Sequence, residues 1–131
     1  MHYVELVAVL AVLQSMTFGL LTGNERSRSG LKAPAITGDE GFERMYRVQM
    51  NTLELLVAFL PSLFLAARYW PAPWVAGLGL VFLVGRLMYW RAYVSDPVKR
   101  GTGFMLSILP TSFLAILALV GIVLSMTGLR A

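Results

Sequence analysis

Four long apolar segments constrain the fold of this chain of 131 residues. They cover about residues 3–22, 42–67, 74–93 and 104–125. Each has close to the roughly 20 residues that an α-helix needs to cross a bilayer. A helix also satisfies its own backbone hydrogen bonds, as a segment in lipid has to. The sequence therefore predicts an all-α fold: a four-helix transmembrane bundle that forms a single domain over residues 1–131.

The composition agrees with a membrane protein. Only 14% of the residues are charged and 57% are hydrophobic, whereas soluble domains carry about 25% charged residues. The first apolar segment has neither the basic start nor the small-residue cleavage site of a signal peptide. We therefore expect it to remain in the mature protein as a membrane span.

The basic residues are distributed unevenly between the two ends of the spans. Nine of the 11 lie on the side of the first and third loops, and only Arg68 and Arg130 lie on the other side. The positive-inside rule then predicts that these two loops face the cytoplasm and that both termini face away from it. Because the basic residues flank spans, the net charge of +4 does not indicate a nucleic-acid partner.

Several kinds of chemistry are excluded by the residues present. The chain has no cysteine and a single histidine, His2. Disulfides, zinc sites and a protein thiol nucleophile are therefore excluded, and we predict no metal. Any thiol chemistry would need a thiol that arrives with a substrate.

Residues 42–54 place charged and amide side chains at the start of the second span. Arg47, Asn51 and Glu54 have the spacing i, i+4 and i+7, which puts them on one face of a helix. Arg44 lies close to them in the sequence. A charged side chain at the centre of a membrane helix costs about 2.5–3.5 kcal/mol, so such residues usually pair or bind a polar ligand.

The third span repeats this arrangement near the same predicted membrane surface. Arg86, Tyr89 and Tyr93 have the spacing i, i+3 and i+7, and Lys99 and Arg100 follow in the next loop. Arginine recognises carboxylates, a glutamate can bind an α-amino group, and an amide can bind a peptide backbone. Together these side chains suit a zwitterionic peptide.

Simpler explanations remain open for each set of residues. Tyr89 and Tyr93 are also typical of an aromatic belt at a membrane surface. Lys99 and Arg100 can serve only to orient the chain. Arg47 and Glu54 can form a purely structural ion pair between helices.

Gln49 provides an argument about oligomeric state. It lies two residues after Arg47 and therefore points to nearly the opposite side of the helix. One chain cannot direct both side chains to the same ligand. If both bind one ligand, the site lies between chains, and we expect a homo-oligomer.

The segment Phe-Glu-Arg-Met-Tyr-Arg-Val-Gln-Met-Asn-Thr-Leu-Glu at residues 42–54 resembles the hallmark of the MAPEG family, the membrane-associated proteins in eicosanoid and glutathione metabolism. The resemblance is greatest to its branch of leukotriene C synthases and type 2 microsomal glutathione transferases. It extends to Gly-Arg-Leu-Met-Tyr at residues 85–89, and to Tyr93, Arg100 and Arg26. The resemblance implies a homotrimer of four-helix chains, with glutathione bound between adjacent subunits near the cytoplasmic side.

The resemblance also implies roles for individual residues. One chain would bind glutathione through Arg47, Asn51, Glu54, Arg86, Tyr89 and Tyr93. The neighbouring chain would contribute Arg26 and Gln49. Arg100 would be catalytic, because it would stabilise the thiolate of glutathione. The implied function is a glutathione transferase that conjugates lipophilic electrophiles from the bilayer, with reduction of lipid hydroperoxides as a side activity.

Two positions depart from the pattern of the leukotriene branch. Leu55 replaces a tyrosine that would donate a hydrogen bond to glutathione, and Ser27 replaces a second arginine. These departures predict weaker binding of glutathione or different handling of the product. A non-catalytic, lipid-binding or scaffold member of the same family is the alternative, and it ranks second because nearly the full set of glutathione-binding residues is present. A small exporter of cations ranks lower, because it would need a carboxylate in mid-span and the first span has only Glu5, at its end.

Overall fold

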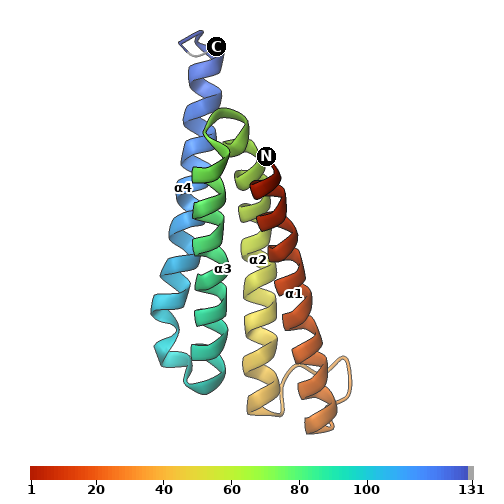
Figure 1. The fold of residues 1–131 in the computed structure, drawn as a ribbon. Helices are drawn as coiled ribbons and strands as arrows, with labels where there is room; N and C mark the ends of the chain where they lie inside the picture. Colours follow the sequence, from red (N-terminus) through yellow and green to blue (C-terminus); the bar gives the residue numbers. More distant parts are fainter. Residues whose placement is uncertain (130–131) are drawn as a thin grey trace.

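The computed structural model describes residues 1–129 and consists of helices throughout (Figure 1). The long helices are α1 (His2–Ser29), α2 (Glu40–Tyr69), α3 (Ala72–Ser95) and α4 (Gly101–Met126), and a short 3₁₀ helix η1 (Pro97–Arg100) precedes α4. Each of the four is long and apolar enough to span a membrane. The predicted four-helix fold is confirmed. Arg130, which the orientation argument used, lies outside the described residues.

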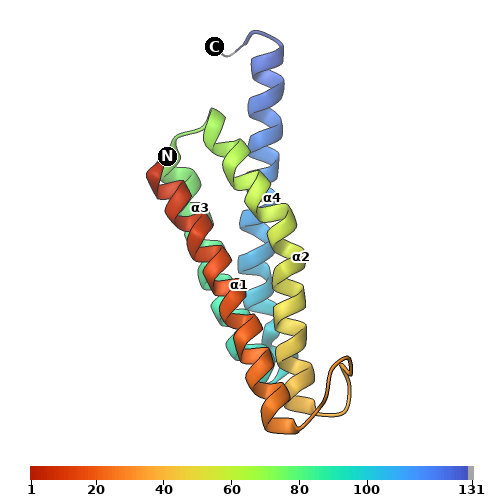
Figure 2. The same ribbon diagram turned by 90° about the vertical axis from the view of Figure 1, so that its right-hand side faces the viewer.

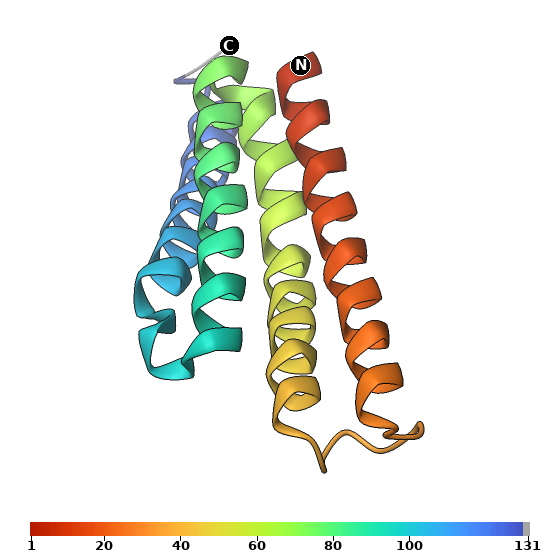
Figure 3. The same cartoon turned by 60° about the horizontal axis from the view of Figure 1, so that its bottom comes forward.

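The helices run alternately up and down, so the N-terminus and the end of α4 lie at the same end of the bundle (Figures 1 and 2). α2 and α3 each pack against the other three long helices. α1 and α4 lie on the two outer sides, with α2 and α3 between them (Figure 3). The α1–α2 loop and η1 lie at the same end of the bundle, which is the end where the sequence places most of the cations (Figure 1).

Tight packing holds the bundle together, since lipid supplies little hydrophobic driving force between helices. Phe59 of α2 and Phe82 of α3 stack with ring centroids 3.9 Å apart. Small residues bring α3 and α4 into backbone contact: a Cβ atom on Gly103 would lie 2.3 Å from the Tyr89 backbone nitrogen. A Cβ atom on Gly85 would lie 2.6 Å from the Leu106 carbonyl carbon. The start of α4 is therefore fixed against α3.

The loops are shorter than the sequence indicated. The segment 23–41 between the first two predicted spans is helical as far as Ser29. The loop was expected because these residues are polar, but a helix that extends from the membrane into water can be polar. Gly30 ends this helix in the left-handed conformation, with φ of 73°. The expected loop over residues 95–103 likewise contains η1 and the start of α4. α2 continues without a break through Pro61.

The start of α2 is stabilised by its capping residue and by a neighbouring arginine. The Asp39 carboxylate accepts a hydrogen bond from the Phe42 backbone N–H at 2.9 Å. This bond and the nearby Arg28 guanidinium lower the pKa of Asp39. Arg28 also pairs with Glu25, at 2.6 Å. These contacts join the end of α1 to the start of α2.

Candidate functional site

Arg86 is fully buried at the centre of the candidate site. It lies on the buried face of α3, on the same stripe as Gly79, Phe82 and Tyr89. Both terminal nitrogens of its guanidinium donate to Asn51 Oδ1 of α2, each at 3.3 Å. The guanidinium carbon also lies 4.1 Å from the centre of the Tyr89 ring.

The charge of Arg86 has no acidic partner among the described residues. None of the ion pairs in this part of the chain includes Arg86. Its Nε atom is buried and makes no hydrogen bond. A buried guanidinium without a carboxylate partner carries an uncompensated charge, which an anionic ligand would neutralise.

Two tyrosines and Arg100 continue the site towards the end of the bundle. The Tyr89 and Tyr93 rings lie 5.4 Å apart. Tyr89 is only 4% exposed, so it packs inside the bundle and does not belong to a lipid-facing belt. Arg100 is exposed and donates to the Pro97 carbonyl at 2.8 Å. Its 3₁₀ helix η1 packs against α3, the helix that carries the two tyrosines. We call Asn51, Arg86, Tyr89, Tyr93 and Arg100 the cationic cluster.

Arg47 and Glu54 lie on the exposed surface of α2. Neither makes a hydrogen bond or an ion pair with another described residue. The structural ion pair considered for Arg47 is therefore not formed within the described part of the chain. These two charges have to be satisfied by water, a ligand or another chain.

Arg26 and Gln49 lie where α1 meets α2. The Arg26 guanidinium stacks 4.4 Å from the centre of the Phe42 ring and donates to the Ala35 carbonyl at 2.8 Å. The Gln49 amide nitrogen packs closely against Gly19, 3.3 Å from where a Cβ atom would stand. Neither side chain is in contact with the cationic cluster of its own chain.

The sequence did not reveal the environments of two α2 residues, Arg44 and Thr52. Arg44 donates to the Val94 and Ser95 carbonyls, at 3.1 and 3.2 Å, and so binds α2 to the end of α3. It also pairs with Glu40. Thr52 is fully buried, and its hydroxyl makes no hydrogen bond. No feature of the sequence distinguishes Thr52 from a threonine that faces lipid.

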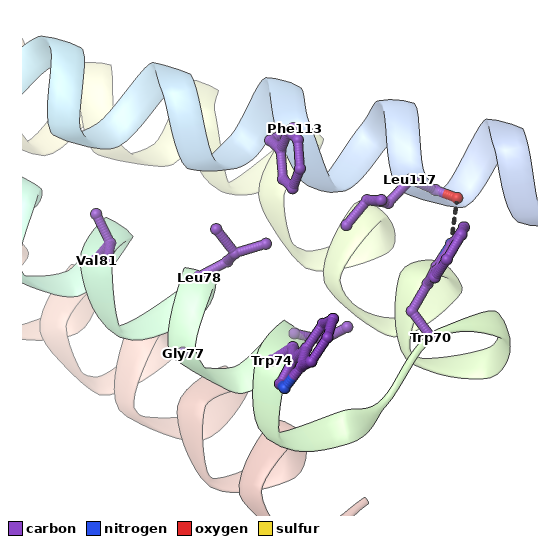
Figure 4. Close-up of a pocket in the computed structure, with 8 residues that line it drawn as sticks. Trp70, Trp74, Gly77, Leu78, Val81, Phe113 and Leu117 are labelled. Carbon is purple, nitrogen blue, oxygen red and sulfur yellow. Dashed lines mark hydrogen bonds between the residues drawn. The ribbon is translucent and has the colours of Figure 1, made fainter.

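A separate apolar groove lies between α3 and α4, at the other end of the bundle (Figure 4). It has a volume of about 480 Å³. Leu78 and Val81 of α3 point towards Phe113 and Leu117 of α4. Trp70 closes one end, where its indole N–H donates to the Leu117 carbonyl at 2.7 Å. The sequence predicted a lipophilic partner but did not locate a groove.

Comparison with known proteins identifies relatives over most of the chain. A protein of Synechocystis sp. that is described as uncharacterized is 41% identical over 89% of this chain and 85% of its own length. Human microsomal glutathione S-transferase 2 is 36% identical over 88% of this chain and 76% of its own length. Bovine leukotriene C4 synthase is 34% identical over 72% of this chain and 63% of its own length.

The family comparison agrees with these relatives. The profile of the MAPEG family matches residues 4–120, nearly the whole chain. The four apolar helices agree with a multi-pass membrane protein of this family. The resemblance seen in the hallmark segment is confirmed, and the chain belongs to the MAPEG family.

Proposed function

We propose that this protein is a membrane glutathione transferase that ionises the thiol of glutathione and transfers it to lipophilic electrophiles. The observation that carries the proposal is the buried Arg86, which contacts the neutral Asn51 amide and Tyr89 and has no acidic partner among the described residues. The names of two relatives, a glutathione S-transferase and a leukotriene C4 synthase, support the same chemistry.

The unpaired charges on α2 complement the charges of glutathione. Glutathione carries two carboxylates and one ammonium group. Arg47 offers a guanidinium for a carboxylate, and Glu54 offers a carboxylate for the ammonium. Asn51 and Arg86 supply further donors close to the same helix face. Binding of the tripeptide would satisfy charges that the described part of the chain leaves unpaired.

A second chain completes this proposed site. Gln49 and Arg26 lie at the α1–α2 surface and do not reach the cationic cluster of their own chain. From an adjacent subunit they could contact a ligand that lies on Arg47 and Glu54. We therefore place glutathione between subunits of a homotrimer, which is the assembly that the family resemblance implies.

Arg100 is the proposed catalytic residue. A free thiol has a pKa near 8.5, so little thiolate exists at neutral pH. A guanidinium beside the sulfur stabilises the anion, and each unit by which the pKa falls corresponds to about 1.4 kcal/mol. The thiolate then attacks an electrophilic carbon and forms a carbon–sulfur bond, while the electron pair moves to the leaving group or the opened ring.

The test compares Arg100→Ala with the adjacent control Lys99→Ala in detergent-purified protein. Thiolate formation is followed by its ultraviolet absorbance, and glutathione affinity by equilibrium binding. We expect Arg100→Ala to lose the thiolate signal and conjugation while it still binds glutathione, whereas Lys99→Ala keeps both. If Arg100→Ala retained full conjugation, the catalytic assignment would be wrong.

A non-catalytic, lipid-binding role is the second candidate, and the apolar groove of Figure 4 favours it. The same binding experiment separates the two functions. A transferase binds glutathione measurably, and Arg47→Ala or Glu54→Ala weakens that binding. A lipid-binding protein would bind no glutathione, and these substitutions would have no effect.

A further inference from the structure

Two apolar grooves of nearly equal size flank α3 at the end remote from the cationic cluster. The α3–α4 groove has a volume of about 480 Å³ and the α1–α3 groove about 470 Å³. Both volumes lie within the range of about 300–1,000 Å³ that is usual for ligand pockets. The α1–α3 groove is lined by Tyr3, Leu6, Val7, Leu10, Pro73, Ala76, Gly77 and Leu80.

Gly77 lines both grooves and forms a low saddle between them on α3. A Cβ atom at Gly77 would meet nothing within 4 Å, whereas one at Gly79 would lie 2.5 Å from Val7. Close packing against Val7 thus explains why a glycine stands at position 79, but no contact within the chain requires a glycine at position 77. Glycine inside a helix costs about 1 kcal/mol relative to alanine. A close approach from outside the chain would account for it.

Two aromatic side chains with free polar groups stand at the same end of the grooves. Trp74 is 75% exposed and lines the α3–α4 groove, and Tyr3 is 65% exposed and lines the α1–α3 groove. Neither the indole N–H nor the phenol O–H makes a hydrogen bond to another described residue. Tryptophan and tyrosine occupy this position at membrane surfaces, where their polar groups meet lipid headgroups.

We infer that one diacyl glycerophospholipid binds astride α3, with one acyl chain in each groove and its glycerol ester region at Trp74 and Tyr3. The two chains run on either side of α3, and the glycine at the saddle lets the lipid lie against the helix backbone. The two free donors meet the ester or phosphate oxygens. This site is distinct from the proposed glutathione site and does not depend on it.

The shape of the surface favours this occupant over another protein helix. A helix with its side chains is about 10–12 Å wide, so it could lie over the saddle at Gly77 but could not fill the two grooves on either side of it. A lipid with a single chain would fill only one groove. Two flexible chains that share one headgroup match two grooves that begin at the same membrane surface.

Native mass spectrometry of the detergent-purified, delipidated protein tests the inference. Dioleoyl phosphatidylglycerol and its single-chain lyso form are added back separately. We expect one diacyl lipid per chain, with the lyso form bound about tenfold more weakly. Gly77→Leu fills the saddle and should weaken diacyl binding by a similar factor. Gly23→Leu is the matched control, because a Cβ atom there also meets nothing within 4 Å and lies outside both grooves.

A fluorescence measurement supports the same test. Diacyl lipid with brominated chains should quench the emission of Trp70 and Trp74, which both line the α3–α4 groove, and Trp70→Phe combined with Trp74→Phe should remove most of that quenching. Equal affinity for the diacyl and lyso forms would overturn the inference. So would equal diacyl binding by Gly77→Leu and Gly23→Leu, after thermal unfolding has shown that both variants are folded.

Discussion

The contact between Arg86 and Asn51 gives the sharpest prediction for stability. Asn51→Leu removes the oxygen that accepts a hydrogen bond from each terminal nitrogen of the buried guanidinium. Both donors then lose this acceptor while the charge stays buried. Hydrogen bonds to charged groups contribute about 1.5–3 kcal/mol, so the free energy of unfolding should fall by about 2 kcal/mol. Arg86→Leu should cost less, because the half-buried Asn51 can turn its amide towards water.

The double variant separates stability from function. When apolar groups replace both partners, no buried polar atom of the pair is left unsatisfied, and such exchanges are nearly neutral. Asn51→Leu combined with Arg86→Leu should therefore unfold close to the wild-type temperature. It should still fail to bind glutathione, because both proposed ligand-binding groups are gone.

Thermal unfolding in detergent without glutathione measures the first effect, and equilibrium binding measures the second. Thr17→Val is the control, because it removes an exposed polar group that bonds only within its own helix. Its stability should change by no more than about 0.5 kcal/mol. If the double variant were as unstable as Asn51→Leu alone, the cost would not arise from an unpaired buried charge, and the reasoning would be refuted.

Other contacts give three further predictions. Gly103→Leu should lower the stability of the bundle in thermal unfolding by about 1–3 kcal/mol or more, because a Cβ atom there collides with the α3 backbone. Gly101→Leu is the control: a Cβ atom there meets nothing within 4 Å, so the stability should not fall. Arg44→Leu should speed hydrogen exchange at the end of α3 by about fivefold, corresponding to about 1 kcal/mol, because the bonds to the carbonyls of its last residues are lost. The pKa of Asp39 is lowered by folding, so its contribution to stability is present above the unfolded pKa of about 4 and is lost as the pH falls below it. Limited proteolysis of residues 30–38 should therefore accelerate on acidification in the wild type, and less so in Asp39→Asn.

The fold was predictable from the sequence because membrane insertion depends on length and apolarity, and both can be read along the chain. The ends of the helices were not predictable in this way. The seven residues 23–29 are polar and yet helical, since a helix can continue into water while its apolar stretch ends at the lipid boundary. Only Gly30, with its left-handed backbone, marks the true end of α1.

The residues of the candidate site were predictable in part. Helical spacing placed Arg86, Tyr89 and Tyr93 on one face, and the structure places them in one cluster. Spacing within single helices could not show that Arg86 would meet Asn51, because that contact depends on how α2 packs against α3. Spacing also could not show that Arg44 and Arg47 have different environments. The former binds the end of α3, and the latter remains unpaired.

The difference between Arg86 and Arg47 indicates how the site is organised. Arg86 is held rigidly by an amide and a ring inside one chain, whereas Arg47 and Glu54 extend from the surface of α2 without partners. In the proposed glutathione site, the buried Arg86 would orient the ligand, and Arg47 and Glu54 would complete its binding once a second chain covers them. One half of the proposed site would then be formed within a single chain and the other half by assembly. Glutathione binding should depend on protein concentration wherever dilution in detergent separates the subunits.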